Sequence, residues 1–215
     1  MMMSILLSLL FYRTPSFAFT DDETRRYEEL SSSIGNGQAI PYCLPYPKFR
    51  FLQYLSLQET YLFHGSNHHD IEEFEPREQT LINNELATAV FATAEPFWAL
   101  FYAVLDRNLL TGSFRNGCLI NGDKKYVFYS LNQATFERKP WREGTLYIVP
   151  RDKFRRSVRT KLQFDEWIST ESVAPIGKIS VNSADFYHLN RVAIHKDQES
   201  ILKTWLFYKA RILLS

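Results

Sequence analysis

Short apolar runs separated by polar turns dominate the chain from Glu59 onward. The runs are rich in β-branched and aromatic residues and are bounded by turn-forming residues, which is typical of strands. This pattern predicts strands at residues 60–64, 89–93, 125–131, 145–149 and 178–181. Few helical segments separate these strands, and strand and helix do not alternate regularly. The pattern therefore predicts an α+β fold rather than a regular βαβ arrangement.

Helical signals gather in the first sixty residues and in two later segments. Thr20-Asp21-Asp22-Glu23 has the form of a capping box, which predicts a helix that ends near the serines at 31–33. Apolar spacing predicts further helices at residues 49–57, 96–106 and 199–214, and a helical turn at 183–185. We therefore divide the chain into a mostly helical N-terminal extension, residues 1–58, and a main domain, residues 59–215.

Composition adds few constraints. A chain of 215 residues with 45% hydrophobic residues has the size and apolar content of one large domain. The formal net charge of +1 gives no clear signal for nucleic acid or for a membrane, and nothing in the sequence indicates an oligomer. The basic cluster at residues 151–159 is interpreted as a solvated surface, with a phosphate-contacting patch as the alternative.

Two cysteines, Cys43 and Cys118, lie far apart and form no metal or redox motif. They are typical of a reducing compartment, so we expect a cytoplasmic protein. Residues 4–12 resemble the apolar region of a signal peptide, with residues 16–18 as the cleavage site. No basic residue precedes this run, and it is too short to span a membrane. Residues 1–18 are therefore interpreted as an apolar N-terminal arm or an extended gene start, with a signal peptide as the alternative, which would make the protein secreted.

Three segments contain the residues best suited to chemistry. The first is a predicted strand that ends in Phe63-His64-Gly65-Ser66, where a titratable ring meets a residue without a side chain. In the second, residues 90–102, a strand turns into a helix that carries several aromatic rings. The third contains Glu166-Trp167-Ile168 at a predicted strand start. Each segment alone also fits a structural role, in which the histidine and the rings belong to the core and Glu166 to the surface.

In this order, the three segments resemble the ADP-ribosyltransferase fold family, particularly its diphtheria-toxin-like and poly(ADP-ribose)-polymerase-like branch. The similarity covers roughly residues 59 to 185. It includes Phe91-Ala92-Thr93, Ala99-Leu100-Phe101 and the run Val173-Ala174-Pro175-Ile176. The resemblance implies two small, mainly antiparallel sheets that form a nucleotide cleft. It also implies an NAD-dependent ADP-ribosyltransferase or NAD glycohydrolase, with NAD as substrate and an unknown acceptor of ADP-ribose.

The resemblance also implies roles for individual residues. His64 would donate a hydrogen bond to a ribose hydroxyl, Gly65 would hold the nicotinamide carboxamide through its backbone, and Phe101 would stack on the nicotinamide. Glu166 would bind the ribose and stabilise the positive charge that develops as nicotinamide leaves. The expected catalytic residues are Glu166 and His64. The expected NAD-binding residues are His64, Gly65, Ser66, Phe91, Phe101, Tyr102 and Arg77, the last as a pyrophosphate partner.

Elementary chemistry asks for the same residue types. Cleavage of a glycosidic bond to a pyridinium requires a negative group beside the developing positive charge, and flat rings suit a flat leaving group. One departure from the family pattern is Val90, which occupies a slot where a tyrosine often packs on the nicotinamide. Phe91 or Tyr102 would then supply the missing ring.

Several alternatives remain at this level. His64, His68, His69 and Asp70 superficially resemble metal ligands, but their spacing does not fit one helical face, so no metal is expected. A catalytically inactive nucleotide- or nucleic-acid-end-binding module of the same fold would explain Val90. An RNA phosphotransferase would need several arginines to converge on one pocket, and Arg77, Arg107 and residues 151–159 are the candidates.

Overall fold

A computed structural model describes residues 2–80, 85–157 and 162–214 of the chain. The described residues form an α+β fold with three mainly antiparallel sheets, so the predicted class is confirmed and the expected number of two sheets is wrong. All five predicted strands are present, with bounds that differ by a few residues. Most strands that the pattern did not predict are short or polar, such as Arg77–Thr80, which is exposed throughout, but the eight-residue strand Phe114–Asn121 was also missed.

The first sheet contains five strands in the described residues, with β6 at its centre. β5 pairs with one edge of β6, while β1 and β12 pair with different parts of the other edge, and only the β6–β12 pair is parallel. The strands are β1 (Tyr12–Arg13), β5 (Phe114–Asn121), β6 (Lys124–Asn132), β9 (Gln163–Phe164) and β12 (Val192–His195).

The other two sheets are smaller, and both are antiparallel. One has the order β3–β4–β10–β8, formed by β3 (Arg77–Thr80), β4 (Leu86–Ala92), β10 (Trp167–Ser169) and β8 (Arg155–Arg156). The other has the order β11–β7–β2, formed by β11 (Gly177–Val181), β7 (Gly144–Pro150) and β2 (Tyr61–Ser66). A backbone bridge between Phe63 and Thr93 joins β2 to the chain that leaves β4.

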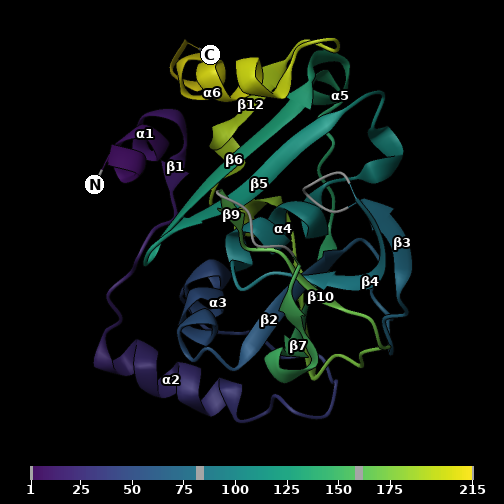
Figure 1. The fold of residues 1–215 in the computed structure, drawn as a ribbon. Coiled ribbons are helices and arrows are strands. Elements are labelled where there is room, and N and C mark those ends of the chain that lie inside the picture. Colours follow the sequence, from purple (N-terminus) through teal and green to yellow (C-terminus); the bar gives the residue numbers. More distant parts are fainter. Residues whose placement is uncertain (1, 81–84, 158–161, 215) are drawn as a thin grey trace.

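The described part of the chain contains six α-helices, five of them outside the sheets (Figure 1). They are α1 (Met2–Leu10), α2 (Asp21–Ser31), α3 (Lys48–Leu57), α4 (Pro96–Val104), α5 (Gln133–Glu137) and α6 (Ile201–Leu214). Short 3-10 turns occupy Arg107–Leu109, Arg151–Lys153, Ser183–Asp185 and Leu189–Arg191. The predicted capping box of α2 is present, with Thr20 and Glu23 bonded reciprocally.

Helix α4 lies at the centre of the molecule, among the sheets (Figure 1). Pro96 occupies its first turn, and the carboxylate of Glu95 accepts a hydrogen bond from the backbone N–H of Phe97. Every residue of α4 except Tyr102 is buried. The helix ends at Val104, earlier than predicted, because Leu105 adopts an extended backbone and bridges to Trp141.

The largest apolar core surrounds α4 and includes residues from the N-terminal extension. Tyr27 of α2 and Phe51 of α3 are fully buried in the same cluster as Phe63 and Phe101. A second layer of apolar side chains lies between the five-stranded sheet and the pair α1 and α6. None of the helices described is long and apolar enough to cross a membrane.

Candidate functional site

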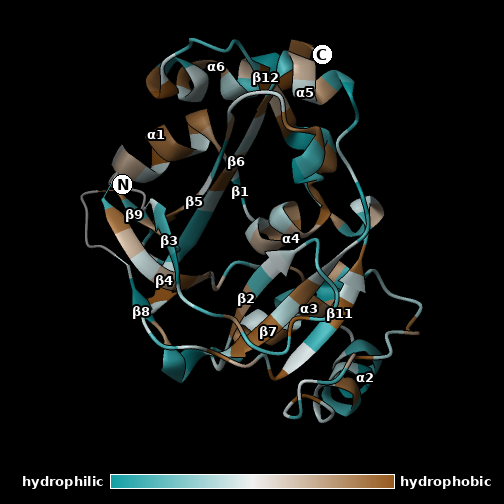
Figure 2. Cartoon of the chain, turned by 90° about the vertical axis from the view of Figure 1, so that its right-hand side faces the viewer, coloured by the Kyte–Doolittle hydropathy of each residue, from teal (hydrophilic) through white to brown (hydrophobic). Residues whose placement is uncertain are grey.

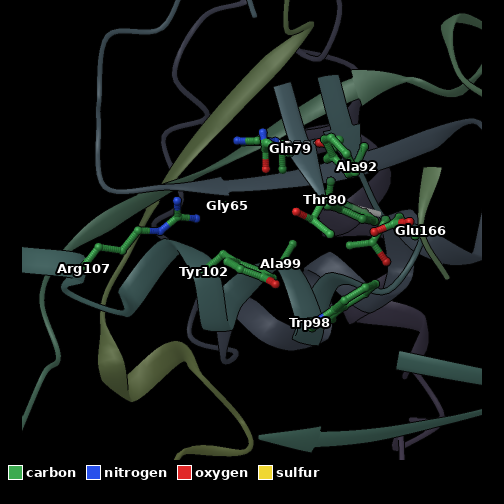
Figure 3. A pocket seen from close by; sticks show the side chains of 13 residues that line it. Gly65, Gln79, Thr80, Ala92, Trp98, Ala99, Tyr102, Arg107 and Glu166 are labelled. Atoms are coloured by element: carbon green, nitrogen blue, oxygen red, sulfur yellow. Dashed lines mark hydrogen bonds between the residues drawn. The ribbon is translucent and has the colours of Figure 1, made fainter. Parts of the chain in front are cut away.

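A cavity of about 160 Å³ lies where β2, β4, β3, α4 and the start of β10 meet (Figure 3). Five of the eight predicted site residues line it: His64, Gly65, Phe91, Tyr102 and Glu166. The other lining residues are Phe63, Gln79, Thr80, Ala92, Thr93, Trp98, Ala99 and Arg107. The structure therefore brings together the three segments that the sequence analysis singled out. Ser66, Phe101 and Arg77 do not line this cavity.

His64 lies on β2 next to β4, and its ring is held by the backbone. Its Nδ1 lies 2.7 Å from the carbonyl oxygen of Phe91, which can only accept, so Nδ1 carries the proton. Burial lowers the pKa of His64, with a smaller contribution from the positive charges of Arg107 and Arg77. The ring is therefore neutral at pH 7, and Nε2 is a hydrogen-bond acceptor. The family resemblance implies that His64 donates a hydrogen bond to the ligand, whereas here its Nε2 can only accept one.

Gly65 is required by the close approach of β2 to α4. A Cβ atom at this position would collide with the backbone of Ala99 and Ala103. Gly144, on the neighbouring strand β7, meets α4 in the same way, against the carbonyl of Ala103. The two glycines let the helix lie directly on the sheet. The glycine after His64 therefore has a packing role in addition to its place in the cavity wall.

Of the two neighbouring α4 rings that were predicted to bind the ligand, Tyr102 lines the cavity and Phe101 does not. Phe101 is fully buried, and its ring packs against Tyr129 and Phe186 with centroid distances of 5.0 and 5.9 Å. Tyr102 is partly exposed and lies in the wall with Trp98, four residues earlier on the same helical face (Figure 3). The side chain of Trp98 is oriented by a 2.6 Å hydrogen bond from Nε1 to Asn116 Oδ1.

The structure also places Val90, the residue at which the sequence departs from the family pattern. Val90 is buried in the apolar cluster on the far side of β4 from its neighbour Phe91, and it does not line the cavity. Phe91 does line the cavity and is partly exposed. Phe91 and Tyr102 therefore provide aromatic surface from two different elements, β4 and α4.

Glu166 directly precedes β10, as predicted, and its side chain reaches the cavity at the end away from Arg107 (Figure 3). Its backbone carbonyl accepts a hydrogen bond of 3.0 Å from Ser157 N–H. Its negative charge is one of the influences on Tyr102: burial chiefly raises the pKa of that phenol, and Glu166 raises it further. A carboxylate and a phenol ring therefore share the cavity.

A buried cluster of charges fixes the segment that carries Glu166. Asp165 is fully buried, and its carboxylate lies 2.9 Å from Lys125 Nζ and accepts a 2.9 Å hydrogen bond from Trp167 Nε1. Lys125 also donates to the carbonyl of Ala94 and lies 3.6 Å from Glu95. Burial alone would lower the pKa of Lys125, but the two carboxylates raise it above its ordinary value, so the ammonium stays charged. The cluster links β6, the start of α4 and β10, and thereby positions Glu166.

The arginines that the sequence analysis considered do not gather around one pocket. Arg107, in the turn after α4, lines the cavity, whereas Arg77 is exposed on β3. Arg151 and Arg156 of the basic cluster pack on the ring of Trp167, each 4.7 Å from its centroid. Residues 158 and 159 of that cluster lie outside the described residues. Arg107 is thus the one arginine that reaches the cavity from the described part of the chain.

Two further polar residues that the sequence analysis considered make local hydrogen bonds. Ser66 ends β2, and its hydroxyl accepts a hydrogen bond of 3.1 Å from the N–H of His68 in the following turn. His69 Nδ1 lies 2.9 Å from the hydroxyl of Thr145. Within residues 2–80, 85–157 and 162–214, no three histidine, cysteine or acidic side chains are grouped closely enough to hold a metal ion.

Sequence reasoning missed several lining residues. Gln79 and Thr80 come from a strand with four exposed polar residues, which has no apolar pattern to mark it. Thr93 was visible as the small polar residue between the predicted strand and helix, and Trp98 as one of the rings of α4. Comparisons of the chain with protein-family models, curated proteins and solved structures give no match.

Proposed function

We propose that the protein is an NAD-dependent ADP-ribosyltransferase or NAD glycohydrolase. It cleaves the bond between nicotinamide and ribose and passes ADP-ribose to an acceptor or to water. The observation that carries this proposal is the presence of His64, Tyr102 and Glu166 in the wall of one cavity, although they come from distant parts of the sequence. The family resemblance rests on the same three segments.

The polarity of the cavity supports a sugar as part of the ligand. The neutral His64 ring offers an acceptor at Nε2, and an ionised Glu166 offers only acceptors, so both groups favour a ligand with hydroxyl donors. A ribose supplies such donors. Both groups would therefore accept hydrogen bonds from the nicotinamide-linked ribose, and His64 would orient the sugar rather than protonate it.

The size and aromatic lining support a flat ring as a second part of the ligand. A cavity of about 150 Å³ is large enough to admit benzene, and this cavity measures about 160 Å³. Phe91, Trp98 and Tyr102 provide aromatic surface for stacking. Nicotinamide is a single six-membered ring with a carboxamide, so a cavity of this volume can hold it. Tyr102 takes the stacking role that the resemblance assigns to Phe101.

The proposed reaction breaks the carbon–nitrogen bond between ribose and the pyridinium. The electron pair of that bond leaves with nicotinamide, which becomes neutral, and the ribose carbon becomes positively charged. Glu166 stabilises this charge electrostatically until an acceptor or water attacks and loses a proton. Arg107, at the other end of the cavity, provides a positive charge for the pyrophosphate in place of Arg77.

The two alternative functions have less support. An RNA phosphotransferase needs several arginines around one pocket, and in the described residues only Arg107 lines the cavity. A catalytically inactive binding module was suggested by Val90, but Phe91 and Tyr102 supply rings to the same cavity. Binding of NAD without release of nicotinamide would favour the inactive module over the enzyme.

The test is to incubate the purified protein with NAD and to measure free nicotinamide by chromatography. Glu166→Gln removes the negative charge with little change in size, so we expect nicotinamide release to decrease by about 100- to 1,000-fold. The matched control is Glu171→Gln, an exposed glutamate just beyond β10, which should retain the wild-type rate. Equal rates in wild type and Glu166→Gln would remove Glu166 from the reaction, and absence of release by wild type would contradict the proposed activity.

A further inference from the structure

Exposed apolar side chains are concentrated on two helices at opposite ends of the chain. Among the described residues, twelve large hydrophobic side chains are exposed, and ten of them belong to α1 or α6. These ten are Met3, Ile5, Leu6, Leu9, Ile201, Leu202, Leu206, Phe207, Leu213 and Leu214. Single exposed leucines are ordinary, but a concentration of this kind marks an interaction surface.

Helix α1 is apolar on both its buried and its exposed sides. Leu7 and the following Phe11 pack against the five-stranded sheet. Ile5, Leu6 and Leu9 lie on other sides of the same helix and are about half or more exposed. A helix that is hydrophobic all round normally has its whole surface buried. We therefore expect the exposed apolar side of α1 to be buried against a binding partner.

Helix α6 continues this surface. Thr204 and Tyr208 face the sheet and are fully buried, whereas Leu202, Leu206 and Leu213 form a stripe on the opposite side. Both helices cover the same face of the five-stranded sheet, and Lys209 of α6 donates a hydrogen bond to a backbone carbonyl of α1. Figure 1 shows α1 and α6 at the same end of the molecule, and Figure 2 shows the apolar character of both helices. We call their common outer side the α1–α6 face.

The charged side chains that α1 and α6 themselves carry are all of one sign. Helix α1 has no charged side chain, and α6 carries Lys203, Lys209 and Arg211 but no acidic residue. Arg211 is neutralised by a 2.6 Å ion pair with Glu199, so the two lysines remain as the basic groups of the helix. A second copy of the chain docked on this face would bring like charges together. Anionic lipid headgroups complement them.

We propose that the α1–α6 face binds the surface of an anionic lipid bilayer, with both helices lying in the plane of the interface. Leucines that enter the acyl region beside lysines at the headgroups are typical of interfacial helices. The sequence alone gave no such signal because the whole-chain charge is +1 and the two apolar helices are separated by most of the chain. This inference is independent of the proposed enzymatic activity.

The test is sedimentation of the full-length protein with phosphatidylcholine vesicles that contain about one-quarter phosphatidylserine. We expect binding to these vesicles and much weaker binding to pure phosphatidylcholine or at high salt. The double variant Leu202→Gln/Leu206→Gln should weaken binding about tenfold or more, because two apolar side chains no longer enter the bilayer. Lys203→Gln should weaken it about fivefold, as expected for one basic residue near an anionic surface.

Matched controls come from the two exposed leucines outside this face. Leu57 and Leu86 are 63% and 67% exposed, close to the 64% and 69% of Leu206 and Leu202. The Leu57→Gln/Leu86→Gln variant should bind vesicles like wild type. Equal loss of binding in both double variants would overturn the proposal. So would a stable dimer in analytical ultracentrifugation that does not bind vesicles and that Leu202→Gln/Leu206→Gln dissociates.

Discussion

The two sides of helix α4 have the same kinds of residue and opposite surroundings. On the core side, Phe97 and Phe101 pack among rings, and Phe97 lies 5.6 Å from the fully buried His188. On the cavity side, Trp98 and Tyr102 share a hollow with His64. An aromatic residue and a histidine thus pack in the core on one side of the helix and line a cavity on the other. The comparison teaches that residue type alone does not distinguish core positions from positions that line a cavity. The three-dimensional structure is needed to tell them apart.

The sharpest test of this comparison is a pair of substitutions at adjacent positions of α4. Phe101→Ala should lower the free energy of unfolding by about 3–5 kcal/mol because it leaves a void in the core. Tyr102→Ala should lower it by only about 1 kcal/mol, since the ring already borders a cavity. Denaturant unfolding measures both values. Comparable losses in the two variants would mean that the sides of the helix do not differ as described.

The glycine contact between β2 and α4 gives the next largest effect. Gly65→Ala should destabilise the protein by about 1–3 kcal/mol, because the new methyl group meets helix backbone that cannot move aside easily. Gly177→Ala on β11 is the matched control in the same sheet, where the nearest atom to the added Cβ lies at 3.5 Å. Thermal unfolding of both variants checks the prediction, and a Gly65→Ala protein as stable as Gly177→Ala would refute the close approach.

The core histidine gives a pH-dependent effect. Burial, with a contribution from Arg191, lowers the pKa of His188 to about 3. The unfolded chain therefore takes up a proton near pH 6.5 that the folded protein excludes, so His188 adds stability above pH 6.5 that decreases as the pH falls toward 3. Burial lowers the pKa of His195 to about 4, so His195 also makes the free energy of unfolding decrease as the pH falls.

His188→Phe removes one titrating group and keeps a ring among Phe97, Tyr129 and Tyr187. The free energy of unfolding, measured from pH 7 to pH 4, should decrease less steeply in this variant, by about 3 kcal/mol over the range. An unchanged slope would show that the native state already accepts a proton at His188.

The cavity histidine should give the smallest effect on stability and a distinct effect on ligand affinity. His64→Ala removes one hydrogen bond to the backbone and the acceptor proposed for ribose, so NAD affinity should decrease up to about tenfold. The melting temperature should change less than in Phe101→Ala. Calorimetric titration of NAD measures the affinity, and a large loss of stability with unchanged affinity would assign His64 to the fold alone.

Much of the fold was predictable from the sequence, and the parts that were not have physical reasons. Five strands were found from their apolar runs. Strand β3 was missed because all four of its residues are exposed, β5 because polar residues and a glycine interrupt its first half, and β12 because it is only four residues long. Phe101 and Tyr102 were both predicted to bind the ligand, but only Tyr102 lines the cavity. Helix α4 is buried on almost every side, so its apolar periodicity does not mark which ring faces the cavity. The anchoring of Asp165 by Lys125 joins residues that no local pattern connects.

Saturation-transfer NMR of NAD with the Glu166→Gln protein tests the central claim most directly, because this variant should bind NAD without consuming it. If Tyr102 stacks on the nicotinamide, the nicotinamide protons receive strong saturation, which is lost in Glu166→Gln/Tyr102→Ala and retained in Glu166→Gln/Phe101→Leu. Saturation confined to the adenine protons, or a nicotinamide signal unaffected by Tyr102→Ala, would contradict the proposed placement of NAD in this cavity.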